Sequence, residues 1–263
     1  MSEPVAPPQE KTFRKFSHQQ GAEYAQHRRD YHPKLYQTLV DHHTSTGGQF
    51  DTLLDVGCGP GLAARALAPH FRHVIGIDPS EGMLNSAIEL GGESASSEPI
   101  PDGSVDLLVV STAAHWFNMP LFWARAAQVL KPGGTVALWT NGSIIRLDDY
   151  MEPGNRHNRE LYVNMQLPWT VPDPVTEFDK ESFVRKEWGT DTPVSDLEKV
   201  MATTSPVARW REAHPDAANT EEDITRTMRR EIEKAMHDAG VEEGKELLSG
   251  TAAAVMLIVK KKA

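Results

Sequence analysis

A short glycine-rich turn is the feature that most limits what this chain can fold into. The residues Asp55-Val56-Gly57-Cys58-Gly59-Pro60-Gly61 follow an apolar run at 52–56 that is typical of a buried strand, and a helix-like stretch at 60–69 begins within them. Glycines at such a turn let the backbone approach a ligand closely, beside the amide groups of a helix N-terminus. The turn therefore predicts a binding site for a nucleotide-like ligand.

The spacing within the turn disfavours two common nucleotide sites. A dinucleotide-binding turn places its third glycine at the position occupied here by Leu62, whereas the glycine comes one residue earlier, at Gly61. A phosphate-binding P-loop requires Gly-Lys-Ser/Thr, and no lysine follows within this turn. Hydride transfer with NAD becomes a distant alternative, and kinases or NTPases of the P-loop type are excluded.

A second acidic residue lies where it can complete the nucleotide site. Asp78 ends the apolar run 73–77 and stands 19 residues after Gly59. A carboxylate at the end of the neighbouring strand can accept hydrogen bonds from both hydroxyls of a ribose. We therefore expect Asp78 to bind the sugar of the ligand.

Strand-like and helix-like segments alternate along the middle of the chain. This order predicts an α/β fold with a Rossmann-like, mostly parallel sheet, whose last strand is inserted antiparallel. The expected strands are 52–56, 73–77, 105–110, 135–140 and 251–259, and the expected helices include 60–69, one capped by Ser80, 121–130, and one from Thr220 with Asp223 to Gly240.

The chain is expected to form one domain with several parts. Its length of 263 residues and 39% hydrophobic content suffice for a large core. The expected parts are a flexible tail at 1–12, an N-terminal lid over the cofactor at 13–48, a cofactor-binding core at 49–140, a helical cap and acceptor region at 141–240, and a closing strand at 241–263.

Composition excludes several kinds of partner. The formal net charge of −10 repels polyanions, which disfavours nucleic acid as a substrate. The longest apolar run, 252–259, is too short for a membrane helix, and residues 1–10 lack the apolar stretch of a signal peptide. The single cysteine, Cys58, fits a reducing compartment. We expect a cytoplasmic protein without nucleic-acid, membrane or obligate protein partners.

The glycine turn and the segment Gly76-Ile77-Asp78-Pro79-Ser80-Glu81-Gly82-Met83 together resemble class I methyltransferases that use S-adenosylmethionine. Ala114-His115-Trp116-Phe117 and Leu130-Lys131-Pro132-Gly133-Gly134 resemble the fungal small-molecule branch of that family. This branch includes gliotoxin thiol methyltransferases and trans-aconitate methyltransferases. The likeness covers about 13–140 well, and it implies S-adenosylmethionine as cofactor, S-adenosylhomocysteine as product, and a role in secondary metabolism and detoxification.

The resemblance also implies roles for individual residues. The three glycines would approach the methionine and ribose portions, Asp78 would bind the ribose hydroxyls, and Met83 would lie against the adenine. Arg28 or Arg29 would meet the cofactor carboxylate or an acidic substrate. The implied cofactor site comprises Tyr24, Arg28, Asp55, Gly57, Gly59, Gly61, Asp78, Met83 and Ser111.

Two residues are the candidates for the acceptor side. His115 follows a strand end that, in this family, faces the transferred methyl group, so it is the best candidate for a base, although a role in bonding the cap is as compatible with the sequence. Trp116 is expected to form a wall of the acceptor site. Cys58 has no base beside it in the sequence and is not expected to act as a nucleophile. His42 and His43 are interpreted as surface histidines, and no metal site is expected.

The acceptor follows from the lack of an evident base. A thiol is partly ionised near neutral pH and a carboxylate is fully ionised, so neither needs strong activation. S-methylation of a small dithiol of the gliotoxin type is the preferred hypothesis, and O-methylation of a small carboxylic acid of the trans-aconitate type is the alternative. A protein that binds S-adenosylmethionine without catalysis remains a third hypothesis.

One departure from the family concerns the third strand of the sheet. Class I sheets normally place a strand between the helix that ends near Leu90 and the strand that begins at Val105. Only 91–104 intervene here, and they contain no strand-like run. We expect a shortened third-strand region, which leaves the residue that contacts the adenine unidentified.

Overall fold

The computed structural model describes residues 11–28, 30–91, 99–142 and 147–263. Its centre is a six-stranded sheet in the order β2-β1-β3-β4-β6-β5. The first four strands are parallel, whereas β6 runs antiparallel between β4 and β5. The predicted Rossmann-like class of fold is confirmed, including the antiparallel insertion of the last strand. The strands are β1 (Thr52–Val56), β2 (His73–Ile77), β3 (Val105–Ser111), β4 (Leu130–Asn141), β5 (Phe178–Pro193) and β6 (Leu247–Lys261).

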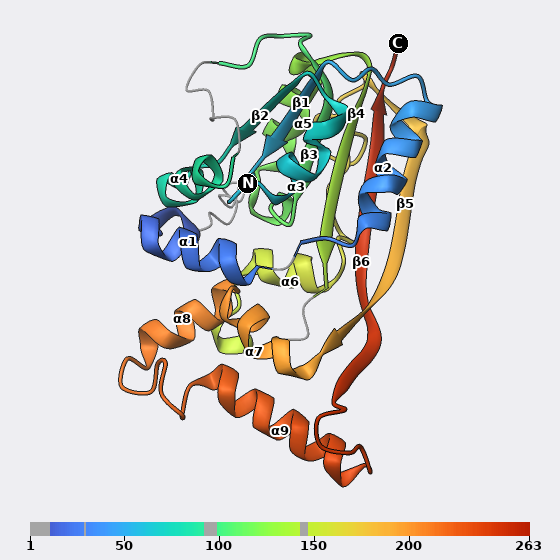
Figure 1. Cartoon of the computed structure of the whole chain (residues 1–263). Helices are drawn as coiled ribbons and strands as arrows, with labels where there is room; N and C mark the ends of the chain where they lie inside the picture. Colours follow the sequence, from blue (N-terminus) through green and yellow to red (C-terminus); the bar gives the residue numbers. More distant parts are fainter. Residues whose placement is uncertain (1–10, 29, 92–98, 143–146) are drawn as a thin grey trace, which may run out of the picture.

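Helices cover both faces of the sheet and extend beyond one end of it (Figure 1). Ser80 caps α4 through a hydrogen bond from the Met83 amide, as predicted. Asp223 alone caps α9, by accepting from the Thr225 amide, so the predicted Thr220 start is three residues early. The α-helices are α1 (His18–His27), α2 (Pro33–Ser45), α3 (Leu62–Leu67), α4 (Glu81–Glu89), α5 (Met119–Val129), α6 (Pro153–Arg159), α7 (Val194–Ala202), α8 (Ser205–Ala213) and α9 (Ile224–Asp238).

The hydrophobic core divides by the side of the sheet on which each strand residue lies. Leu107 and Val109 of β3 pack with the helices α2 and α3, whereas Leu108 and Val110 pack with α5. This alternation follows from the two-residue period of a strand, and burial on both faces requires the continuous apolar runs seen in the sequence. His43 belongs to this core, because it is fully buried and contacts the Thr135 hydroxyl at 2.7 Å. The interpretation of His43 as a surface residue is wrong.

Two glycines fix the N-terminal helix against the sheet domain. A Cβ at Gly21 of α1 would come within 2.3 Å of the Gly82 carbonyl oxygen of α4, and a Cβ at Gly82 would come as close to the Phe16 carbonyl. Only glycine allows backbones to approach to this degree. The contact places α1 beside the first residues of α4, next to the carboxyl ends of the parallel strands.

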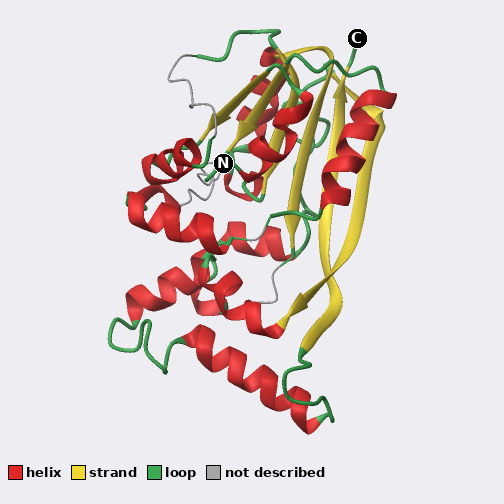
Figure 2. Ribbon diagram, in the orientation of Figure 1, coloured by secondary structure: helices red, strands yellow, loops and turns green. Residues whose placement is uncertain are grey.

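The long strand β5 corrects the prediction of a helical cap over 141–240, because residues 178–193 of that region form a strand. It pairs with β6 over most of its length, and both strands continue past the other strands toward α7, α8 and α9 (Figure 2). The helices α7, α8 and α9 pack around a separate small cluster that includes Leu197, Met201 and Val207. The region after β4 therefore contains helix α6, then strand β5 of the main sheet, and then a helical extension.

The strand β2 lies at the edge of the sheet, where class I sheets normally have a further strand. Among the described residues, β2 pairs with β1 alone, and no strand lies between α4 and β3. Residues 92–98 of that connection lie outside the described part of the chain.

In the described residues, no helix is long and apolar enough to cross a membrane.

Candidate functional site

The glycine-rich turn adopts the backbone geometry that its sequence predicts. Gly57, Gly59 and Gly61 have φ angles of 71°, 53° and 76°, a region that other residues rarely occupy. A Cβ at Gly57 would meet the Cβ of Ala113 at 2.7 Å, whereas a Cβ at Gly59 would meet no atom within 4 Å. Gly57 therefore allows the turn to pack against β3, and Gly59 leaves open space above the turn.

Asp78 joins the turn to the end of β2. Its Oδ2 accepts a hydrogen bond from the Gly59 amide at 2.9 Å, and its Oδ1 accepts one from the Ser80 amide at 2.8 Å. Burial raises the pKa of Asp78, and these two hydrogen bonds and the charge of Arg14 act against that rise. Each carboxylate oxygen has a further lone pair with which it can accept a hydrogen bond from a ligand.

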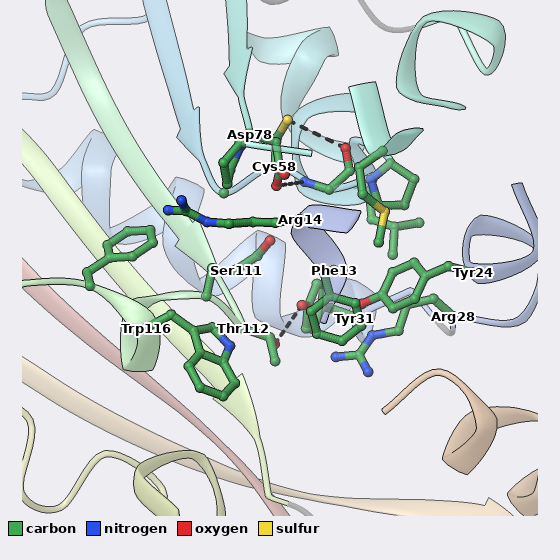
Figure 3. A pocket seen from close by; sticks show the side chains of 18 residues that line it. Phe13, Arg14, Tyr24, Arg28, Tyr31, Cys58, Asp78, Ser111, Thr112 and Trp116 are labelled. Carbon is green, nitrogen blue, oxygen red and sulfur yellow. Dashed lines mark hydrogen bonds between the residues drawn. The ribbon is translucent and has the colours of Figure 1, made fainter. Parts of the chain in front are cut away.

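A cavity opens above the turn, at the carboxyl ends of β1, β2 and β3 (Figure 3). The N-terminal segment forms one wall, the glycine turn and Asp78 form the opposite wall, and the residues after β3 form the floor. It is lined by Phe13, Arg14, Tyr24, Arg28, Tyr31, Gly57, Cys58, Gly59, Pro60, Leu62, Asp78, Pro79, Met83, Ser111, Thr112, Ala113, Trp116 and Phe117.

Most of the residues expected from the sequence line this one cavity. They are Tyr24, Arg28, Gly57, Gly59, Asp78, Met83, Ser111 and Trp116. Three others lie behind its surface. Gly61 is the N-cap of α3, Asp55 is fully buried in β1, and His115 is buried on the far side of Trp116. Arg29 lies outside the described residues.

Asp55 supports the turn from below. Its Oδ2 accepts a hydrogen bond from the Ala64 amide of α3 at 3.2 Å. Within the described residues, its Oδ1 is buried without a hydrogen-bond partner. Burial raises the pKa of Asp55 to about 7, and the Ala64 hydrogen bond opposes this shift. In this position Asp55 ties the strand to the helix that carries the turn.

Arg28 brings a positive charge to the wall formed by the N-terminal segment. Its guanidinium lies 5.8 Å from the ring centre of Tyr24. The neighbouring Tyr24 and Tyr31 raise the pKa of Arg28, and burial acts against that rise. In the part of the chain that the structure describes, no carboxylate lies within ion-pair distance of it. A buried or half-buried cation without a counter-ion is unfavourable, so this charge favours an anionic group of a ligand.

His115 does not face the cavity. Its Nδ1 lies 3.0 Å from the Tyr162 hydroxyl, and its ring lies beside that of Trp116, with 5.0 Å between the ring centres. Burial lowers the pKa of His115 to about 3, and the charges of Arg28 and His157 add to this effect. A histidine with so low a pKa is neutral and a weak base, and Trp116 beside it, not His115, lines the cavity.

Sequence reasoning did not single out several residues of the wall. Phe13 and Arg14 enter the cavity because η1 (Phe13–Lys15) stands just before α1. Thr112, directly after β3, has a φ angle of 51°, which is rare for a β-branched residue, and its hydroxyl lies 2.7 Å from that of Tyr31. No sequence pattern marks these residues, since only the folding of the N-terminal segment over the strand ends brings them together.

Cys58 lies on the cavity wall without being reactive. The side chain is buried, and burial raises the pKa of its thiol far above the usual value. A thiol that stays protonated is a poor nucleophile. Among the described residues, there is no group of three or more His, Cys, Asp or Glu that could hold a metal ion.

The wall residues fit S-adenosylmethionine. The open space above Gly59 admits a ligand against the backbone, Asp78 offers acceptors for a ribose, Met83 offers an apolar surface, and Arg28 offers a cation for a carboxylate. The fold is Rossmann-like, and its cavity lies at the carboxyl ends of the parallel strands.

Comparison with known proteins finds similarity to methyltransferases. Residues 54–138 match the family described as the methyltransferase domain. The chain is 30% identical over 155 residues to a presumed methyltransferase of Dictyostelium discoideum, a match that covers 57% of this chain and 57% of the relative. It is also 30% identical over 159 residues to trans-aconitate 2-methyltransferase of Paracidovorax citrulli, covering 53% and 58%.

The matches leave part of each relative uncovered. The chain spans little more than half the length of these two relatives. Among solved structures, a presumed type II methyltransferase from Anaeromyxobacter dehalogenans aligns with a TM-score of 0.57 and 21% identity, covering 89% of this chain and 97% of that one. This likeness shows the fold. The family match at 54–138 contains the glycine turn, Asp78 and Trp116.

Proposed function

We propose that this chain is an S-adenosylmethionine-dependent methyltransferase that acts on a small molecule. The observation that carries the proposal is a single cavity lined by the open backbone at Gly59, the carboxylate of Asp78 and the cation of Arg28. Each group suits one part of this cofactor, and the matched methyltransferase domain contains two of the three.

The chain's own residues have little chemistry to perform. When bound, S-adenosylmethionine supplies a methyl group on a positively charged sulfur, which departs as a neutral thioether. The protein must align the acceptor with this methyl group and exclude water, and such alignment contributes roughly 7–11 kcal/mol. Ser111, Thr112, Ala113 and Trp116 lie at the end of β3, where we place the acceptor.

We assign Arg28 to the carboxylate of the cofactor. Replacing Arg28 with alanine is expected to weaken S-adenosylhomocysteine binding about tenfold, because one charge-assisted hydrogen bond to a carboxylate is lost. Binding of 5′-methylthioadenosine should be unchanged, since this nucleoside has the same thioether and ribose without the amino-acid portion. Calorimetry with both ligands measures the difference.

A different result would assign Arg28 to the acceptor instead of the cofactor. If Arg28 instead holds an anionic acceptor, the Arg28→Ala protein will bind both nucleosides normally, and only the KM for the acceptor will rise. Replacement of the exposed Lys34, which stands at the start of α2 outside the cavity, provides the matched control for loss of a positive charge.

Among the described residues that line the cavity near Trp116 there is no base, so we infer an acceptor that ionises without help. With the Arg28 charge neutralised by the cofactor, the wall near Trp116, Phe117 and Ala113 is apolar and aromatic. This surface favours S-methylation of a largely apolar dithiol. The specific observation that favours carboxylate O-methylation is the similarity to trans-aconitate 2-methyltransferase, whose name denotes a carboxylate-rich acceptor.

One assay tests the function and separates these acceptors. The protein is incubated with S-adenosylmethionine and either small dithiols, kept reduced, or small carboxylic acids, and each product is identified by its mass gain. With a thiol acceptor, turnover should rise between about pH 6 and 9 as the thiolate forms, since a free thiol has a pKa of about 8.5. Methyl groups found only on carboxylates would establish the alternative, and cofactor binding without any product would favour a non-catalytic binding protein.

A further inference from the structure

A buried polar cluster lies directly behind the acceptor wall. Tyr162, which is only 2% exposed, follows α6, and its hydroxyl lies 3.0 Å from His115 Nδ1. The side chain of Thr140 in β4 lies beside this hydroxyl. Thr140 in turn donates to Asn158 Oδ1 of α6 at 2.6 Å. The cluster therefore connects the end of β4, helix α6 and the 3₁₀ turn Ala114–Trp116.

The backbone at this cluster is held in an unusual conformation. Leu161 and Tyr162 have φ angles of 55° and 57°, although neither is a glycine. The surrounding contacts maintain them, because the Tyr162 amide donates to the His157 carbonyl and the Arg185 guanidinium donates to the Leu161 carbonyl. Bulky residues persist in this region only where the surroundings determine the conformation, and such positions concentrate at functional sites.

The cluster reaches the cavity through Trp116. The His115 ring lies against the indole on one side, with 5.0 Å between the ring centres. On another side lies Gly154 of α6, where an added Cβ would come within 2.5 Å of the indole Cε3 and 2.9 Å of the His115 carbonyl oxygen. Helix α6 thus contacts Trp116 directly through Gly154. Tyr162, in the segment that follows α6, reaches Trp116 through His115.

We propose that Tyr162 is a positioning residue that sets the orientation of the Trp116 indole through His115. The inference rests on the proposed function, because Trp116 matters as a wall of the acceptor site. Tyr162 and His115 touch neither the cavity nor a ligand bound in it. A change in either should therefore alter the alignment of the acceptor and leave cofactor binding intact.

The test uses Tyr162→Phe, which keeps the buried ring and removes only the hydroxyl, with Tyr150→Phe as the matched control. Tyr150 is a half-buried cap residue whose ring contacts His214. We expect Tyr162→Phe to lower kcat/KM for the acceptor about tenfold, with S-adenosylhomocysteine affinity within about twofold of wild type. Tyr150→Phe should change neither quantity. His115→Gln provides a second variant, and its effect combined with Tyr162→Phe should be less than the product of the two.

A readout independent of turnover distinguishes this proposal from the proposed function. In protein labelled with 5-fluorotryptophan, the ¹⁹F resonance missing from Trp116→Phe belongs to Trp116. That resonance should shift in Tyr162→Phe and in His115→Gln, and stay in place in Tyr150→Phe. An unmoved Trp116 resonance overturns the positioning role. A shifted resonance in a protein that methylates no acceptor supports the positioning role and contradicts the proposed function.

Discussion

Replacing Asp78 with alanine is expected to weaken the binding of S-adenosylmethionine about 10- to 150-fold, which corresponds to about 1.5–3 kcal/mol for hydrogen bonds to a charged group. Two causes act together. The ribose hydroxyls lose their acceptors, and the Gly59 and Ser80 amides lose the carboxylate that holds the turn in place. Isothermal calorimetry with the cofactor and with S-adenosylhomocysteine measures the loss.

Two further variants show whether the loss comes from this site. Asp78→Asn retains one oxygen acceptor and should lie between wild type and Asp78→Ala. Asp41→Ala removes an exposed carboxylate from α2, where Gln37 is its partner, and should bind the cofactor normally. Wild-type affinity in Asp78→Ala, or competition by NAD in the wild-type protein, would contradict the assignment of the cofactor site.

Acid is expected to destabilise the wild-type protein relative to His115→Gln. Burial lowers the pKa of His115 from about 6.5 to about 3 in the folded protein. Above about pH 6.5 the histidine is neutral in both states. At lower pH the unfolded state binds a proton that the folded state excludes, so the free energy of unfolding of wild type falls by about 1.4 kcal/mol per pH unit relative to the variant. Between about pH 6 and 4 the relative change should reach about 2.5 kcal/mol.

The measurement has to be the difference between the two proteins. Asp55 has a raised pKa of about 7, so the folded state takes up a proton there as pH falls, which opposes the effect of His115. His42 and His43 have lowered pKa values and add to it, whereas Asp78 has a raised one. These contributions are common to both proteins and cancel when urea unfolding is compared at each pH. A difference that stays constant with pH would mean that His115 is accessible to protons in the folded state.

The expected site residues differ in whether neighbouring sequence or distant contacts determine their position. A glycine-rich turn marks Gly57 and Gly59 in the sequence, and a strand end marks Asp78. Both signals depend on residues close together in the chain, and all three residues line one cavity in the structure. The role of His115 was inferred from its position after a strand. Its side chain contacts Tyr162, 47 residues away in the chain, and does not line the cavity.

The sequence by itself determined much of the parallel part of the sheet, because the mainly apolar runs of β1 and β3 are bounded by turn residues and buried. Strand β2 lies at the edge of the sheet and is mostly half-buried. Strand β5 has no such pattern. Its residues 179–182 and 185–187 are mostly charged or polar, as suits an edge strand, and only pairing with β6 makes it a strand. Tertiary structure alone also decided the cavity wall, since Phe13, Tyr31 and Thr112 meet there only after α1 packs on α4. Local patterns specify elements and turns, whereas contacts between distant segments specify which side chains face a ligand.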